Sequence, residues 1–161
     1  MRVHAALSSQ TLTIAWDIST GDPIVPQPQK VTVPRLLGEP IEMLGYAPET
    51  IVAEKGVTIL ERGITSTRWR DYVDIVQLGA APGFDGELLL ESARAVARYR
   101  QIDLVPTAPV VAGYGGIAQP KWAAWRRKEK VEEISEVLLD EQMSRVEAVL
   151  DPLFARGMFD S

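Results

Sequence analysis

The chain of 161 residues has no cysteine and a single histidine, His4. Without thiolates it can have no disulfide framework, no cysteine nucleophile and no cysteine-bound zinc or iron–sulfur site. One histidine argues against Ser-His-Asp chemistry and excludes a multi-histidine metal site. A metal site in this chain would therefore consist of carboxylates, which favour magnesium or manganese over zinc.

The sequence also lacks a long apolar run and a strong excess of one charge. No apolar stretch approaches the length that crosses a bilayer, and residues 1–9 are too short and polar for a signal peptide. We therefore expect a cytoplasmic protein with no membrane partner. The net charge of −5 offers no global attraction to nucleic acid, so an RNA surface would have to be a local basic patch.

The start of the chain has the pattern of β-strands. Residues 3–7 and 11–18 are expected strands, turn residues 19–23 end the second, and residues 30–34 predict a third. A small hairpin is marginal in water, so its apolar face needs a covering layer. Either partner strands outside this sequence or the later helices would cover it. Apolar side chains alternate along the second strand at Leu12, Ile14, Trp16 and Ile18.

From residue 48 the apolar period becomes helical. Pro48 and Glu49 suit the first turn of a helix, and Ser66 or Thr67 is expected to cap the second helix. Residues 103–120, rich in proline and glycine, are expected to form a loop. The predicted helices are residues 48–63, 68–78, 86–101, 121–130 and 136–150.

These elements predict an α+β protein with a small N-terminal sheet and a helical majority. Residues 1–46 hold the expected sheet and residues 47–161 the helical region. Five apolar residues predict the inner face of the third helix: Leu88, Leu89, Ala93, Val96 and Ala97.

Asp17 is the first residue that could have a chemical role. It ends a strand and projects to the face opposite Leu12 and Ile14. Phosphoryl-transfer enzymes use such a carboxylate as a metal ligand or as a base for an attacking hydroxyl. The alternative is an aspartate that marks a strand end and hydrogen-bonds a turn.

Lys55 and Arg62 share one edge of the apolar stripe of the first predicted helix, because they are seven residues apart. Both could approach a phosphate chain. The structural alternative is a lysine whose stem covers apolar surface and an arginine favoured near a helix C-terminus.

Asp71 and Asp74 lie three apart on one face of the second predicted helix. Arg70 can pair with Asp74 and Arg68 with Asp71, so the group can be a purely structural set of ion pairs. We favour that interpretation for Asp74, whereas Asp71 stays open.

A basic stretch at residues 121–130 interleaves Trp122 and Trp125 with cations. It could bind RNA phosphates with help from stacking. Because the two tryptophans are three apart, a core role for them, with solvated cations, is slightly favoured. The five cations are Lys121, Arg126, Arg127, Lys128 and Lys130.

These motifs together resemble the AbiEii/AbiGii-type nucleotidyltransferase toxin family. The resemblance rests on residues 47–55 (APETIVAEK), 61–63 (ERG) and 67–75 (TRWRDYVDI), in order and with the family's spacing. Residues 12–25 are similar to the family strand that ends in an aspartate. The basic stretch and the last helix are similar to the family's C-terminal part, so the resemblance covers nearly the whole chain.

The resemblance implies a polymerase-β-like nucleotidyltransferase core that uses a nucleoside triphosphate and magnesium, in the toxin of a two-gene toxin–antitoxin system. Some members modify the acceptor end of tRNA, and an antitoxin is the cognate partner. By position, Asp17 matches an active-site metal carboxylate and Lys55 the lysine that steadies the triphosphate. Asp71 would position Lys55 or the acceptor, Asp74 is the second motif aspartate, and Arg62 closes the motif helix.

The chain departs from the family pattern at two points. No Gly-Ser turn followed by an Asp-x-Asp strand precedes Asp17, so two of the three metal carboxylates are missing. We therefore expect a misplaced start, a natural truncation or a degenerate remnant, and the alternative to catalysis is a remnant that binds its antitoxin or RNA. Gly56 also replaces a bulky apolar residue and should loosen its helix by about 1 kcal/mol relative to alanine.

Overall fold

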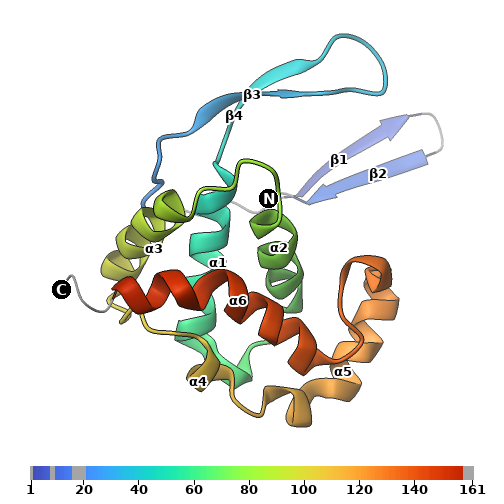
Figure 1. The fold of residues 1–161 in the computed structure, drawn as a ribbon. Helices are drawn as coiled ribbons and strands as arrows, with labels where there is room; N and C mark the ends of the chain where they lie inside the picture. Colours follow the sequence, from blue (N-terminus) through green and yellow to red (C-terminus); the bar gives the residue numbers. More distant parts are fainter. Residues whose placement is uncertain (1, 8–9, 16–20, 158–161) are drawn as a thin grey trace.

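The computed structural model describes residues 2–7, 10–15 and 21–157, with side chains from residue 21 onward. It is an α+β arrangement in which two β-hairpins extend from one side of a helical body (Figure 1). The hairpins pair antiparallel strands: β1 (Arg2–Leu7) with β2 (Gln10–Ala15), and β3 (Gln29–Val33) with β4 (Ile41–Gly45).

The three expected strands are confirmed within the described residues, and β4 is an addition. The described strands form two separate two-stranded sheets, where we expected one small sheet. All five residues of β3 are exposed, as are four of the five in β4. The helices therefore do not cover the β3–β4 hairpin.

The helical body begins with three helices close to their predicted bounds. These are α1 (Pro48–Arg62), α2 (Trp69–Gly79) and α3 (Gly86–Arg100). The expected cap of α2 is displaced. Its N-cap residue, Arg68, makes no side-chain capping bond, and the Ser66 hydroxyl instead accepts the backbone N–H of Arg68 at 3.2 Å.

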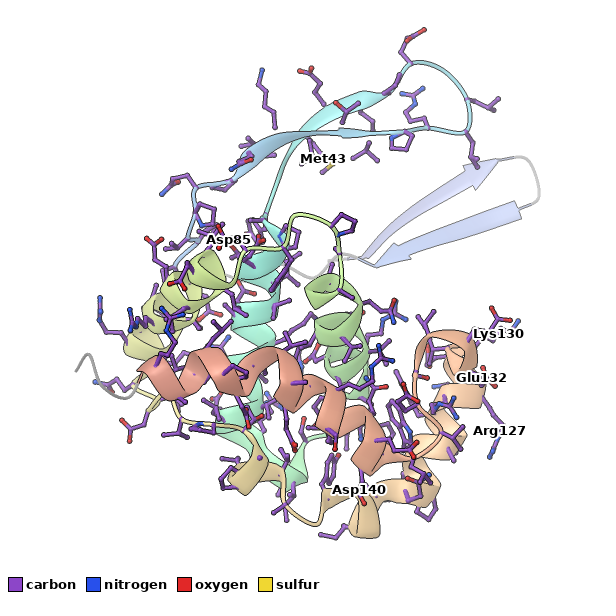
Figure 2. All side chains as sticks on the ribbon, in the orientation of Figure 1. Met43, Asp85, Arg127, Lys130, Glu132 and Asp140 are labelled. Atoms are coloured by element: carbon purple, nitrogen blue, oxygen red, sulfur yellow. The ribbon has the colours of Figure 1, made fainter. Side chains whose placement is uncertain are left out.

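The predicted loop over residues 103–120 is wrong. The structure has the short helix α4 (Ala108–Val111) and then α5 (Tyr114–Glu129), which passes through Pro120. The first turn of α5 is held by Asp140, whose carboxylate accepts the N–H of Gly115 at 2.9 Å and lies beside that turn in Figure 2. A side chain at Gly115 would collide with this carboxylate, so the glycine permits the contact.

The last helix, α6 (Leu139–Gly157), continues past Asp151 and Pro152, where we expected it to end. The Asp151 carboxylate accepts the N–H of Thr107 at 2.6 Å and that of Ala108 at 3.1 Å, so it caps α4. The extra turns bury Phe154 completely. The apolar contact of this last segment with the core accounts for the continuation.

Figure 1 shows α1 between α2 and α3, with α6 running across them. Four of the five residues predicted for the inner face of α3 are buried, and Leu88 is half-buried. Gly56 lies where α1 meets α6, and a Cβ there would be 2.8 Å from Phe154 Cζ. The glycine that departs from the family pattern thus permits close helix packing. The most buried large side chains are Trp122, Tyr72, Tyr114, Phe154, Ile75, Leu89, Leu139 and Leu150.

Candidate functional site

A cleft of about 630 Å³ lies along one side of α1, between the start of α2 and the end of α3. Most of the residues that line it are charged or polar. Its lining residues are Gly21, Asp22, Ile51, Glu54, Lys55, Thr58, Glu61, Arg62, Arg68, Tyr99 and Arg100. We call this hollow the cleft.

Lys55 is held in the wall of the cleft by two carboxylates of α2. Its Nζ lies 2.5 Å from Asp71 Oδ1 and 3.1 Å from Asp74 Oδ2. The side chains are largely shielded, with exposed fractions of 19% for Lys55, 6% for Asp71 and 27% for Asp74. We call these three residues the lysine–aspartate cluster.

The two pairs predicted within α2 complete this cluster. Arg68 Nε lies 2.6 Å from Asp71 Oδ2, and Arg70 Nε lies 3.0 Å from Asp74 Oδ1. Each carboxylate therefore joins Lys55 through one oxygen and an arginine through the other. Asp71 also sits in the first turn of α2, where the helix dipole favours a negative charge. The arrangement fixes the Lys55 ammonium, and among the described residues no third partner engages its remaining N–H donor.

Arg62 and Arg68 are the exposed cations of the cleft. Arg68 uses only Nε in its contact with Asp71, and its side chain is 54% exposed. Arg62 has no ion-pair partner within the part of the chain that the structure describes. Both arginines can therefore offer N–H donors to a bound anion. Lys55 and Arg62, which share one edge of α1, line the same cleft.

Arg100 forms the opposite wall and ties it to the segment that follows β2. Its Nε and Nη2 donate to the two oxygens of Asp22 at 2.9 and 2.5 Å, and its Nη1 donates to Thr58 Oγ1 at 2.9 Å. The hydrogen bond from Arg100 lowers the pKa of the Asp22 carboxyl, and the same bond raises the pKa of Arg100. No local sequence pattern predicts this pair, because its members are 78 positions apart in the chain.

Glu54 lies on the same wall. Burial raises the pKa of its carboxyl, and the negative charge of Asp22 raises it further. Carboxyls with a raised pKa are common in functional clefts, although ion-pair networks shift pKa values as well.

The described residues do not fit a carboxylate metal site. No group of three or more histidine, aspartate or glutamate residues able to hold a metal occurs among residues 21–157. Asp71 and Asp74 are already bound to cations. The predicted metal ligand, Asp17, lies outside the described residues.

The basic end of α5 divides into buried and exposed parts. Trp122 is fully buried and stacks on Trp125 with ring centroids 5.3 Å apart, as the core interpretation predicted. Arg126 differs from the expected RNA-facing cation. It is only 7% exposed, and its guanidinium donates to Ser135 Oγ at 2.9 Å and to the Glu132 carbonyl at 3.1 Å. Arg126 is buried because its guanidinium binds the turn that follows α5.

Four cations of this stretch do reach the surface: Lys121, Arg127, Lys128 and Lys130. Figure 2 shows Arg127 and Lys130 at the outer edge of the molecule, with Glu132 beside them. The patch is therefore of mixed charge.

The fold and the cleft define an α+β protein whose helical body carries a charged cleft with exposed cations. The model of the family described as "Nucleotidyl transferase AbiEii toxin, Type IV TA system" matches residues 1–153, and the chain belongs to this family. The resemblance inferred from the motifs is confirmed. Comparisons with curated proteins and with solved structures gave no match.

The members of this family are nucleotidyltransferase toxins of toxin–antitoxin systems, so an antitoxin is the expected partner of the chain. No helix in the described part of the chain is long and apolar enough to span a membrane.

Proposed function

We propose that this chain takes part in the transfer of a nucleotide from a nucleoside triphosphate to an RNA acceptor such as tRNA, with the lysine–aspartate cluster in its site. The observation that supports this most is the Lys55 ammonium, fixed 2.5 and 3.1 Å from two carboxylates in a cleft with two exposed arginines. A preoriented cation of this kind stabilises phosphate charge without reorganising during the reaction.

The roles follow from the contacts. Lys55 directs its free N–H donor at a phosphate oxygen, and Asp71, the most buried of the cluster, orients Lys55. Asp74 supports the same ammonium from the next turn of α2. Arg62 adds positive charge at the mouth of the cleft. Positioning and electrostatic stabilisation account for most of the catalysis in phosphoryl transfer.

Magnesium would supply charge neutralisation of the triphosphate. The described carboxylates do not fit a metal, so none of them is proposed as its ligand. Asp17 stays the proposed ligand. The 161 residues contain no Gly-Ser dipeptide and no Asp-x-Asp. We infer that transfer requires this motif from outside these residues.

The test is a transfer assay with magnesium, each labelled nucleoside triphosphate and total tRNA. It compares this chain alone with the chain preceded by a segment that carries the Gly-Ser and Asp-x-Asp motif. We expect label in RNA only in the second case, and a loss of at least about 100-fold in Lys55→Met and Asp71→Asn. Lys30→Met, an exposed lysine on β3 outside the cleft and the basic stretch, is the control that keeps activity. Transfer that survives both cluster variants would contradict the proposal.

A second candidate function is binding without chemistry, either of the antitoxin or of RNA. The exposed cations at the end of α5 favour the RNA version. We expect Arg127→Glu with Lys128→Glu to weaken tRNA binding and to reduce its salt dependence by about two ion equivalents. Lys30→Glu with Arg35→Glu on the β3–β4 hairpin, which reverses the same number of charges, is the control. Unchanged affinity and salt slope would exclude the RNA version and leave the antitoxin as the partner.

A further inference from the structure

Tyr99 is an exposed aromatic residue in the wall of the cleft. It stands one residue before the end of α3, is 59% exposed and lines the cleft together with Arg62 and Arg68. Its hydroxyl lies against Gly21, because a Cβ at Gly21 would be 2.9 Å from that oxygen. Gly21 has a φ of +147°, so the backbone that makes room for Tyr99 also favours glycine.

The ring is available for a ligand. No aromatic ring of the described residues stacks on Tyr99, and its hydroxyl has no hydrogen-bond partner among them. Scattered exposed aromatics are ordinary on protein surfaces. This one differs because it faces a cleft whose other lining groups are mostly charged, and such walls favour a ligand with one flat apolar part and one anionic part.

We propose that Tyr99 stacks on the base of a nucleoside triphosphate whose phosphates contact Arg62 and Arg68. The inference rests on the proposed function and adds a base-binding residue to it. A cleft of about 630 Å³ falls in the usual size range of small-ligand sites. Stacking tolerates any base, since every base has a π-face. The site should therefore bind all four nucleoside triphosphates with similar affinity.

The platform is preorganised by its neighbour. Arg100 is fixed by both oxygens of Asp22 and by Thr58, so the backbone at position 99 is held against α1. A tyrosine has only two side-chain torsions to order, and its hydroxyl contacts Gly21. Little conformational entropy is then lost when a base binds.

The test compares the binding of ATP with that of inorganic tripolyphosphate by isothermal titration calorimetry. Tripolyphosphate carries the charge of the nucleotide and has no base. We expect Tyr99→Ala to weaken ATP binding about 5- to 150-fold and to leave tripolyphosphate binding unchanged. Tyr99→Phe should keep wild-type affinity for ATP. Arg62→Ala should weaken both ligands, and Tyr46→Ala, an exposed tyrosine outside the cleft, should change neither.

Each outcome separates the two proposals. Unchanged ATP affinity in Tyr99→Ala would overturn the stacking role and leave the proposed function standing. An equal loss for both ligands would make Tyr99 structural, which also overturns it. If Tyr99→Ala weakened the binding of a short oligoribonucleotide and left that of ATP unchanged, the assignment to the triphosphate would be overturned. If the wild-type chain binds neither ATP nor tripolyphosphate, the cleft is not the triphosphate site and both proposals fail.

Discussion

At the scale of single residues, burial separates side chains that look alike in the sequence. Arg126 and Arg127 are adjacent cations, yet Arg126 is buried and holds a turn whereas Arg127 is exposed. Lys55 similarly could have extended to solvent, and it is instead held between Asp71 and Asp74. Whether a charged side chain is buried depends on whether the tertiary structure supplies it with partners, because an unpaired buried charge is costly.

The Asp22–Arg100 pair predicts a loss of stability in acid. Its hydrogen bond lowers the pKa of Asp22 below the ordinary value of 3.8, so the contribution is complete above about pH 4 and is lost as pH falls through the folded-state pKa. We expect Asp22→Asn to destabilise the protein by about 1.5–3 kcal/mol at pH 7, because it removes a charged hydrogen-bond acceptor.

Urea unfolding of wild type and Asp22→Asn at pH 7, 5 and 3 measures this. The difference between them should shrink below about pH 4 as wild-type Asp22 is protonated. Glu54→Gln is the comparison with the opposite sign. Burial raises the pKa of Glu54, so its charge is unfavourable in the fold at pH 7, and the variant should be at least as stable as wild type there. A difference between wild type and Asp22→Asn that is the same at all three pH values would contradict the prediction.

At the scale of the elements, helix ends are set by groups from other helices. Asp140 of α6 holds the first turn of α5, and Asp151 of the same helix caps α4. Both contacts bridge long stretches of chain, so they are invisible to local capping rules. The contact between α1 and α6 works in the same way, since Gly56 is explained only by Phe154 and Leu150 opposite it.

Gly56→Ala tests that contact. Helix propensity alone predicts a gain of about 1 kcal/mol. The new Cβ would however be 2.8 Å from Phe154 Cζ and 3.2 Å from Leu150 Cδ1, and overpacking of a core costs about 1–3 kcal/mol. We expect a net loss of up to about 2 kcal/mol in urea unfolding.

The matched control for this prediction is Gly116→Ala. Gly116 lies in α5, and a Cβ added there would meet nothing within 4 Å. Only helix propensity acts at this position, so stability should rise. If both alanine variants were stabilised equally, the helix-contact explanation of Gly56 would be wrong.

At the scale of the whole molecule, the core and the hairpins contribute unequally. The helical body contains the apolar core, and the β3–β4 hairpin extends from it (Figure 1). The side chains of this hairpin are almost all exposed. The chain between the hairpins is anchored to the body, since the Val25 carbonyl accepts hydrogen bonds from Thr50 and Ser92, both at 2.5 Å. The cleft lies where this anchored segment meets α1 and α3.

Leu36 and Leu37 at the tip of the β3–β4 hairpin should therefore add almost nothing to stability. Both are exposed, Leu36 completely. We expect Leu36→Ser with Leu37→Ser to leave the midpoint of thermal unfolding within about 2 °C of wild type, because surface changes alter stability by less than about 0.5 kcal/mol. Leu89→Ala in the core is the control and should cost about 2–5 kcal/mol. A marked fall in the midpoint for the hairpin variant would show that its tip is packed in solution.

Features that depend on near neighbours along the chain were predictable from the sequence alone. The periods of α1, α2 and α3 and the arginine–aspartate pairs within α2 were all predicted, because residues three or four apart already specify them. The ordered motifs also identified the family and brought Lys55 and Asp71 together in the prediction. The remaining features required the folded chain. The Asp22–Arg100 wall, the burial of Arg126, the start of α5 and the length of α6 all depend on groups supplied by distant segments or on the space those segments leave, and no local pattern encodes such contacts.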